Sequence, residues 1–472
     1  MSPGRGVRVG GWGRRERRRA ARYNMRLSCV DMRLAMEIQE VPVSAGQSKA
    51  NPHAAWFTQQ RFGMFVHFGI NSIPAGVWKG VPMGRNWYAE WIQMQGNWPK
   101  GIPVAEYQAL TKQFNPVKFD ADAWVREVKN AGMGSICITS KHHDGFALWP
   151  SKVSAYNVMN TPFKRDLLGE LSNACAKHGI KFACYYSHWL DWEHPGGGLP
   201  HPDEFKSEPR HPKRTQEQFE KYWQEKCLPQ VRELIENYHP AFLWFDTWAA
   251  NSSEWITEVR MDELIGLIRR LDPTCLINSR LGTWGHSKGY AAVDFISMMD
   301  NHFPEKGFDQ PWETSGTMNR SWACHQLDHE WHTAKEILTF LIKNASRGGN
   351  YQLNVGPLPT GEFPPQAIRR LREIGAWWLV NGEAIRGTEA SDLPAQKWGL
   401  VTKKKGGGLY YLHVLEPRAG AEIVVRGLRQ VKSARVLETR QALDVLAGHE
   451  HTAITLPAEL RETNIAVVVV EV

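Results

Sequence analysis

The sequence predicts an α/β protein, with a (β/α) TIM-like barrel followed by a C-terminal β-sandwich. Short apolar runs alternate with helical patterns from about residue 61 to 356, which suits a parallel barrel of ~250 residues. Polar side chains follow several of these runs. From about Ser391 the pattern changes to short strands separated by turn residues, which is typical of a sandwich.

These patterns divide the chain into three segments. We expect a basic, disordered segment at 1–45, the barrel at 46–388 and the sandwich at 389–472. Eight Arg and one Glu in residues 1–23 account for +7 of the formal net charge of +8, so the rest of the chain is nearly neutral. An Arg- and Gly-rich tail does not form a core, and a near-neutral remainder argues against nucleic acid as a partner.

Seven apolar runs have the composition of buried parallel strands. They are "FGMFVHF", "GSICITS", "KFACYYS", "AFLWFD", "CLINS", "DFISMM" and "YQLNVG". A doubly wound sheet is the main rival architecture, but no glycine-rich phosphate loop follows the first run. The order of the runs therefore favours a barrel.

Helical patterns lie between several of the runs. They cover 120–132, 167–179, 254–271 and 333–346. Asp120 is suited to cap the first helix, because its side chain can accept a hydrogen bond from the first turn. Gly132 and Gly179 are suited to end the first two helices, because glycine adopts the left-handed conformation at low cost.

The sequence shows no signal for export or membrane insertion. No apolar run of 7–15 residues follows the basic N-terminus, and no stretch approaches ~18–20 continuous apolar residues. The seven cysteines are scattered and form no C-x-x-C pair, which indicates a reduced protein. We therefore expect a cytoplasmic protein by default and no membrane partner. A mis-assigned start, for which Met25, Met32 and Met36 are alternatives, leaves a periplasmic or secreted location open.

Groups capable of catalysis or ligand binding follow six of the predicted strands. They are His67, His142, His143, Tyr185, Asp246, Arg280 and Glu305. In a (β/α) barrel the carboxyl ends of all strands meet at one end, where active sites are built. The sequence therefore predicts a polar pocket at that end.

Three kinds of chemistry compete for this pocket, of which a nucleophilic serine is disfavoured because the sequence has no G-x-S-x-G elbow. A metal site would use His142, His143 and an aspartate, but neighbouring strand residues point to opposite faces, so we expect only one of the two histidines to reach the pocket. No H-x-H or H-E-x-x-H spacing at these strand ends supports a metal, so we expect none. Carboxylate chemistry fits better, because Asp246 closes a buried strand, where a charge is costly unless the site uses it.

The sequence resembles the α-L-fucosidases of glycoside hydrolase family 29. The resemblance runs through "WFTQQRFGMFVHFGINSIPAG", "WYAEW", "KHHDGFALWPSKVSAYNV", "LWFD", "PWETSGTMNRSW" and "GGNYQLNVGP", which follow the family's order. It covers most of residues 56–388. It implies a barrel followed by a sandwich, and retaining hydrolysis of terminal α-L-fucose from fucosylated oligosaccharides or glycoconjugates without metal or cofactor.

The resemblance also implies roles for individual residues. Asp246 in "LWFD" matches the nucleophile, which would form a covalent fucosyl-aspartate. Eight further residues match positions that line the fucose pocket, namely His67, Glu90, Trp91, His142, His143, Tyr185, Trp244 and Arg280. The paired histidines would then bind sugar hydroxyls, because neutral imidazole both donates and accepts hydrogen bonds.

The general acid/base has two candidates. We favour Glu305, which follows a strand end and matches the family's variable acid position a few residues before "WE". Glu313 is the alternative, because its neighbour Trp312 supplies the apolar surroundings that raise a carboxyl pKa. The runner-up functions are another retaining exo-glycosidase on the same barrel and a non-catalytic carbohydrate-binding protein. The fucosyl linkage and a homo-oligomeric state stay open.

Overall fold

The computed structural model describes residues 51–83, 88–95, 101–198, 214–247, 252–282, 293–458 and 465–472. The expected disordered segment 1–45 lies outside these residues. Ser48–Val472 form one compact unit. Within the described ranges, no helix has both the length and the apolar character needed to cross a membrane.

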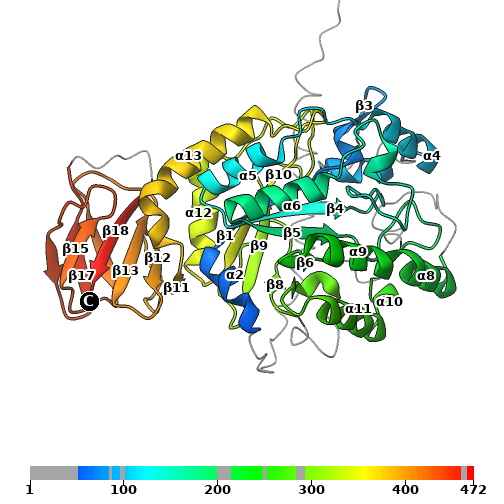
Figure 1. Cartoon of the computed structure of the whole chain (residues 1–472). Coiled ribbons are helices and arrows are strands. Elements are labelled where there is room, and N and C mark those ends of the chain that lie inside the picture. The colour runs from blue at the N-terminus through cyan, green and yellow to red at the C-terminus, as the bar shows by residue number, and fades with distance from the viewer. Residues whose placement is uncertain are drawn as a thin grey trace, which may run out of the picture. The chain divides into compact units, whose positions relative to one another are not determined.

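Eight parallel strands form one sheet in the order β7-β6-β5-β4-β1-β10-β9-β8. They are β1 (Phe62–Val66), β4 (Ser135–Lys141), β5 (Lys181–Tyr186), β6 (Phe242–Trp244), β7 (Leu276–Ile277), β8 (Ile296–Ser297), β9 (Trp312–Thr317) and β10 (Asn350–Val355). A parallel bridge pairs Asn278, just after β7, with Phe295, just before β8, and so joins the two edges of the sheet. The strands thus curl into a barrel (Figure 1), which confirms the predicted fold class.

Seven of these strands correspond to the predicted apolar runs, and β9 was missed. Its sequence, "WETSGT", is too polar to predict a buried strand, yet all six residues are buried. Burial of these polar side chains is possible because neighbouring strands of the barrel offer them hydrogen-bond partners. The Glu313 Oε1 atom accepts hydrogen bonds from Trp244 Nε1 at 2.7 Å and from Ser297 Oγ at 2.9 Å.

Helices cover the outside of the barrel (Figure 1). The longer ones are α5 (Ala121–Asn130), α6 (Leu167–His178), α8 (Gln216–Tyr222), α9 (Leu228–Tyr238), α11 (Glu258–Leu271), α12 (Ala334–Ala345) and α13 (Pro365–Asn381). Shorter elements are α2 (Ala55–Gln60), α3 (Ile92–Gln95), α4 (Val104–Gln108), α10 (Ser252–Trp255), β2 (Val77–Trp78) and β3 (Val81–Pro82). A π-helical turn at Trp223–Cys227 joins α8 to α9.

The predicted helix ends are confirmed for α5 and α6. The Asp120 carboxylate accepts a hydrogen bond from the Ala123 amide at 2.9 Å, and Gly132 and Gly179 have φ angles of 87° and 70°. The predicted helix at 254–271 is divided into α10 and α11, because the Thr257 side chain caps a new helix by accepting from the Arg260 amide.

The C-terminal part contains two antiparallel sheets. The five-stranded sheet has the order β11-β12-β13-β18-β15 and the three-stranded sheet the order β14-β17-β16. The strands are β11 (Thr388–Ala390), β12 (Gly399–Lys404), β13 (Leu409–Val414), β14 (Glu422–Arg426), β15 (Ser433–Val436), β16 (Val445–Ala447), β17 (His451–Thr455) and β18 (Ala466–Glu471). Leu412 and Val468 of the larger sheet share one buried cluster with Val425 and Ile454 of the smaller sheet. This shared core is the packing expected of a sandwich.

Hydrogen bonds connect the barrel part to the sandwich part. The Trp377 indole donates to the Ile465 carbonyl at 2.9 Å, and the Thr402 hydroxyl donates to the Ala384 carbonyl at 2.6 Å. The domain boundary between 388 and 389 therefore lies within one compact unit and stays a prediction.

Closure of the barrel depends on Asp294, and its loss should destabilise the protein. One Asp294 carboxylate oxygen accepts from the Ile277 amide at 2.7 Å and from Arg269 at 2.6 Å, across the seam between β7 and β8. Because charge-assisted bonds to a buried carboxylate are lost together, Asp294→Ala should lower the free energy of unfolding by about 2–3 kcal/mol. Urea unfolding monitored by circular dichroism measures this change. The exposed Asp309 is the matched control, and Asp309→Ala should stay within ~0.5 kcal/mol of wild type. Equal stability of the two variants would contradict the role of Asp294.

Candidate active site

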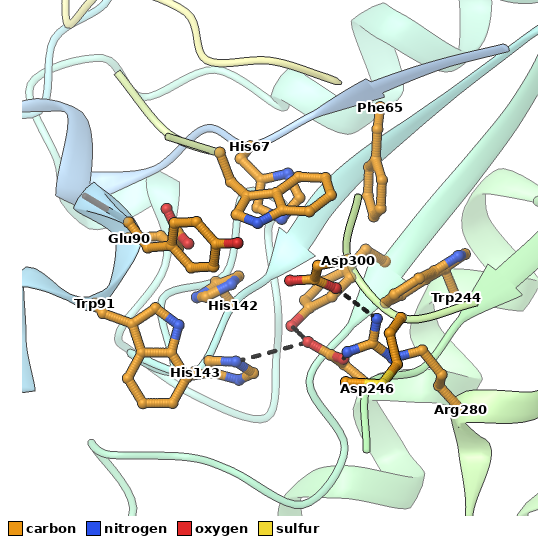
Figure 2. A pocket seen from close by; sticks show the side chains of 14 residues that line it. Phe65, His67, Glu90, Trp91, His142, His143, Trp244, Asp246, Arg280 and Asp300 are labelled. Atoms are coloured by element: carbon orange, nitrogen blue, oxygen red, sulfur yellow. Dashed lines mark hydrogen bonds and ion pairs between the residues drawn. The ribbon is translucent and has the colours of Figure 1, made fainter. Parts of the chain in front are cut away.

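A cavity of about 370 Å³ lies where the barrel strands end (Figure 2). Its walls come from β1, β5 and β6 and from segments that follow β1, β4, β6, β7, β8 and β9. The lining residues are Phe65, His67, Tyr88, Glu90, Trp91, His142, His143, Tyr185, Trp244, Asp246, Arg280, Met299, Asp300 and Trp322. The structure thus brings together nine of the eleven residues expected from the sequence.

Asp246 lies two residues beyond the end of β6, and its carboxylate points into the cavity (Figure 2). One oxygen accepts a hydrogen bond from the Tyr185 hydroxyl at 2.9 Å and lies 3.7 Å from His143 Nε2. The other oxygen lies 2.6 Å from Arg280 Nη2. Burial raises the pKa of Asp246 to about 6, and the guanidinium charge of Arg280 opposes that rise. Asp246 is therefore an ionised carboxylate at neutral pH, held by donors on two sides.

Both His142 and His143 line the cavity, so the expectation that only one would do so was wrong. Strand β4 ends at Lys141, and its pairing with β5 is irregular between Thr139 and Lys141. The histidines therefore lie beyond the regular strand, where the alternation of faces no longer applies.

The three histidines of the cavity are neutral. Burial lowers the pKa of His67 to about 4, and it lowers the pKa values of His142 and His143 well below the ordinary value. His67 Nδ1 lies 2.6 Å from Asn354 Oδ1, and His143 Nδ1 lies 2.7 Å from Ser187 Oγ. His142 Nδ1 is buried without a hydrogen-bond partner among the described residues. His67 and His143, each with Nδ1 fixed by the protein, can present Nε2 to a ligand, and the Nδ1 atom of His142 is open to one.

Aromatic side chains form an apolar wall beside Asp246. Trp244 lies at the centre of this wall, with its ring centroid 5.2 Å from that of Phe65 and 5.6 Å from that of Tyr185. The Arg280 guanidinium lies 4.8 Å from the Trp244 ring centroid, on its face. Cation–π contact of this kind fixes the guanidinium without using its hydrogen-bond donors.

Glu90 and Trp91 come from the short 3-10 helix η3 (Ala89–Trp91). The Glu90 carboxyl accepts a hydrogen bond from the Ala323 amide at 3.1 Å. Burial raises the pKa of Glu90 to about 8, because the charged form loses its hydration. At neutral pH this carboxyl is mostly protonated and can donate a hydrogen bond to a ligand.

Four further residues line the cavity that were not expected from the sequence: Tyr88, Met299, Asp300 and Trp322. Asp300 follows β8 by three residues and lies 2.7 Å from Arg280 Nη1. A signal for it was present in the sequence, because Asp300 is the first acidic residue after the predicted strand "DFISMM". Tyr88 and Trp322 likewise lie within the motifs "WYAEW" and "MNRSW".

The two candidate acids, Glu305 and Glu313, are not among the residues that line the cavity. The Glu305 side chain is 81% exposed and forms ion pairs with Lys343 and Arg347. Glu313 is fully buried in β9 behind Trp244, and burial raises its pKa to about 7. Their catalytic roles stay predictions.

Metal ligation finds no support in the described part of the chain. Among those residues, no group of three or more His, Cys, Asp or Glu side chains could hold a metal ion. His67 and His143 instead contact the Asn354 amide and the Ser187 hydroxyl.

Comparison with known proteins identifies the family. The sequence profile of the α-L-fucosidase family matches residues 30–383. The tissue α-L-fucosidase of Homo sapiens is 28% identical over 387 residues, which cover 79% of this chain and 78% of the relative. The α-L-fucosidase of Dictyostelium discoideum is 26% identical over 438 residues, which cover 89% of each chain.

Solved structures agree with this result. Isoenzyme 1 of the Paenibacillus thiaminolyticus α-L-fucosidase has a TM-score of 0.75 at 32% identity, covering 89% of this chain and 98% of that one. A glycoside hydrolase family 29 α-L-fucosidase from Bacteroides thetaiotaomicron has a TM-score of 0.79 at 28% identity, covering 92% and 98%. With the barrel, the cavity and these matches together, the chain belongs to the α-L-fucosidase family, glycoside hydrolase family 29.

Proposed function

We propose that the protein hydrolyses terminal α-L-fucose from fucosylated oligosaccharides or glycoconjugates with net retention of configuration, through a covalent intermediate on Asp246. The carrying observation is the buried Asp246 carboxylate, held by Tyr185 and Arg280 in the cavity of a chain of this family. A related structure from Bacteroides thetaiotaomicron is a trapped covalent intermediate in complex with 2-fluoro-fucosyl fluoride.

The cavity suits one sugar ring. Its volume of about 370 Å³ lies near the lower end of the range of small-molecule pockets, ~300–1,000 Å³. Most of its lining residues are buried, whereas Met299 and Asp300 are exposed and mark the mouth. We assign the fucose to the buried part and the rest of the substrate to the mouth, which is the arrangement of an exo-acting enzyme.

The groups around Asp246 have complementary tasks. An ionised Asp246 attacks the anomeric carbon, and the Tyr185 hydroxyl and Arg280 hold the carboxylate in place for the attack. His67, His142 and His143 hydrogen-bond to sugar hydroxyls as neutral rings. Phe65, Trp244 and Trp322 receive the apolar side of the sugar that carries the C5 methyl group. No step of this scheme uses a metal, and that expectation stays a prediction.

The proposed function predicts that the enzyme hydrolyses an aryl α-L-fucoside in preference to other aryl glycosides. In a panel of aryl glycosides at matched concentration, the α-L-fucoside should be hydrolysed fastest, and NMR should show the α anomer as the first-formed fucose. Asp246→Ala should lower kcat/KM by about 1,000-fold or more, because the covalent step is lost. The exposed Asp309→Ala should leave kcat/KM unchanged. Faster hydrolysis of another glycoside, or first formation of the β anomer, would contradict the proposal.

Glu90 predicts a pH dependence of fucose binding. The carboxyl has a raised pKa of about 8 and donates only when it is protonated, so binding of free L-fucose should weaken as the pH rises through about 8. The inhibition constant of L-fucose, measured from pH 7 to 9.5 and so above the pKa of about 6 of Asp246, reports this change. Glu90→Gln keeps an N–H donor and does not titrate, so its inhibition constant should be independent of pH over this window. A decline of equal size in Glu90→Gln would assign the titration to another group.

A further inference from the structure

We propose that Asp300 is the general acid/base of this enzyme. The proposal rests on the proposed function, since it assigns the second carboxyl group that retaining hydrolysis requires. Among the described residues that line the cavity, only Glu90, Asp246 and Asp300 carry carboxyl groups. The acid/base for a nucleophile at Asp246 is therefore to be sought between Glu90 and Asp300.

Arg280 contacts both Asp246 and Asp300 and so keeps the two carboxyl groups near each other. Arg280 Nη2 lies 2.6 Å from Asp246, and Arg280 Nη1 lies 2.7 Å from Asp300 (Figure 2). Two carboxyl groups that each contact a terminal nitrogen of the same rigid, planar guanidinium are neighbours in the site, as the mechanism of a retaining enzyme requires. Retaining glycosidases place their carboxyl groups about 5–5.5 Å apart, whereas inverting enzymes separate them by about 6.5–9.5 Å.

Position in the cavity distinguishes Asp300 from Glu90. The acid must reach the glycosidic oxygen, which lies between the sugar in the cavity and the leaving group at the mouth. The Asp300 side chain is 35% exposed and lies at the mouth beside Met299. Glu90 is 2% exposed and is therefore placed for a hydroxyl of the enclosed sugar.

The backbone next to Asp300 is fixed, which keeps its carboxyl at the mouth. Asn301 has a φ angle of 56°, and its amide donates to the Ser315 carbonyl at 2.9 Å. The Asn301 side chain accepts a hydrogen bond from the Thr317 amide at 2.9 Å. The chain is thus attached to β9 immediately after Asp300.

The same loop then carries Glu305 away from the cavity. The Phe303 ring stacks on Phe340 of α12 at 4.7 Å, and the Glu305 carbonyl accepts from Arg347 Nε at 2.9 Å. Arg347 follows the end of α12 and lies three residues before β10 begins. Glu305 therefore lies toward the end of the barrel where strands begin, opposite the cavity.

Arg280 is placed to stabilise the negative charge in both steps of the reaction, formation and hydrolysis of the fucosyl-enzyme, because it contacts both Asp246 and Asp300. In the first step the Asp300 proton moves to the glycosidic oxygen, the bond from C1 to that oxygen breaks, and a carboxylate oxygen of Asp246 bonds to C1. In the second step water attacks C1, its proton moves to Asp300, and the ester bond to Asp246 breaks. Negative charge leaves Asp246 as it appears on Asp300, so Arg280, which contacts both, balances the charge throughout.

Leaving-group dependence and azide rescue test the assignment. For phenyl α-L-fucoside, a poor leaving group, Asp300→Ala should lower kcat/KM by about 100-fold or more. For the dinitrophenyl fucoside, which needs no protonation, the variant should keep a fast first step. Added azide should accelerate its turnover and give the fucosyl azide of retained configuration. Asp309→Ala, an exposed position of the same loop, is the matched control and should stay within about twofold of wild type on both substrates.

Further variants separate catalysis from folding and from placement of Arg280. Asp300→Asn keeps the size of the side chain and should show the same leaving-group dependence, with an unchanged melting temperature and unchanged L-fucose inhibition. Equal losses on both substrates without azide rescue would make Asp300 a positioning residue for Arg280 and overturn the proposal. Retained fucosyl azide from Glu305→Ala or Glu313→Gln in place of Asp300→Ala would also overturn it. Inactivity of the wild type on every α-L-fucoside would instead refute the proposed function.

Discussion

The arrangement of the site depends on one buried cation, Arg280. Its buried guanidinium contacts the Asp246 carboxylate inside the cavity and Asp300 at the mouth, and without these partners a buried charge would be costly. The face of Trp244 fixes the guanidinium, and the Trp244 indole donates to Glu313 inside the barrel. The backbone of Arg280 is held as well, because its carbonyl accepts from the Thr247 amide at 2.9 Å. Glu313 of β9 thus helps to position Asp246, because Glu313 binds Trp244, Trp244 contacts Arg280, and Arg280 contacts Asp246.

A second buried charge cluster supports the opposite wall. The Asp191 carboxylate accepts from Lys141 at 2.8 Å and lies 2.9 Å from Lys226 Nζ, with all three side chains buried. Next to Asp191, the Trp192 amide donates to the His143 carbonyl at 2.8 Å. Loss of one partner would leave an unpaired charge in the core, so the three side chains stay together. Because Asp191 is held in this cluster, its neighbour Trp192 is held too, and Trp192 binds the backbone of His143. Both walls of the cavity are therefore anchored by buried, paired charges.

The sequence predicted the elements whose physical signal is local. Continuous apolar runs identified seven of the barrel strands, and Asp120, Gly132 and Gly179 marked helix ends by capping chemistry. Strand β9 was missed because its stability comes from partners on other strands, which a single polar run does not reveal. The expectation that only one of His142 and His143 would line the cavity was wrong for a related reason. It assumed that β4 continues through both residues, whereas the strand ends at Lys141.

The sequence predicted the site residues that lie at strand ends, but it did not predict which residue of the loop between β8 and β9 lines the cavity. His67, Tyr185, Asp246 and Arg280 lie in or directly after strands, so barrel closure alone brings them together. Between β8 and β9 the sequence offers several acidic residues, and only the path of the loop separates Asp300 at the mouth from Glu305 near Arg347.

Covalent labelling tests the central claim most directly. Incubation with 2-fluoro-fucosyl fluoride should slow hydrolysis of the fucosyl-enzyme, because the fluorine destabilises the oxocarbenium-like transition state. Peptic digestion and tandem mass spectrometry should then place one fluorofucosyl group on Asp246, in the peptide that contains "LWFD". A label on another carboxyl group, or an active wild-type enzyme that accumulates no label, would contradict the assignment of Asp246 as the nucleophile.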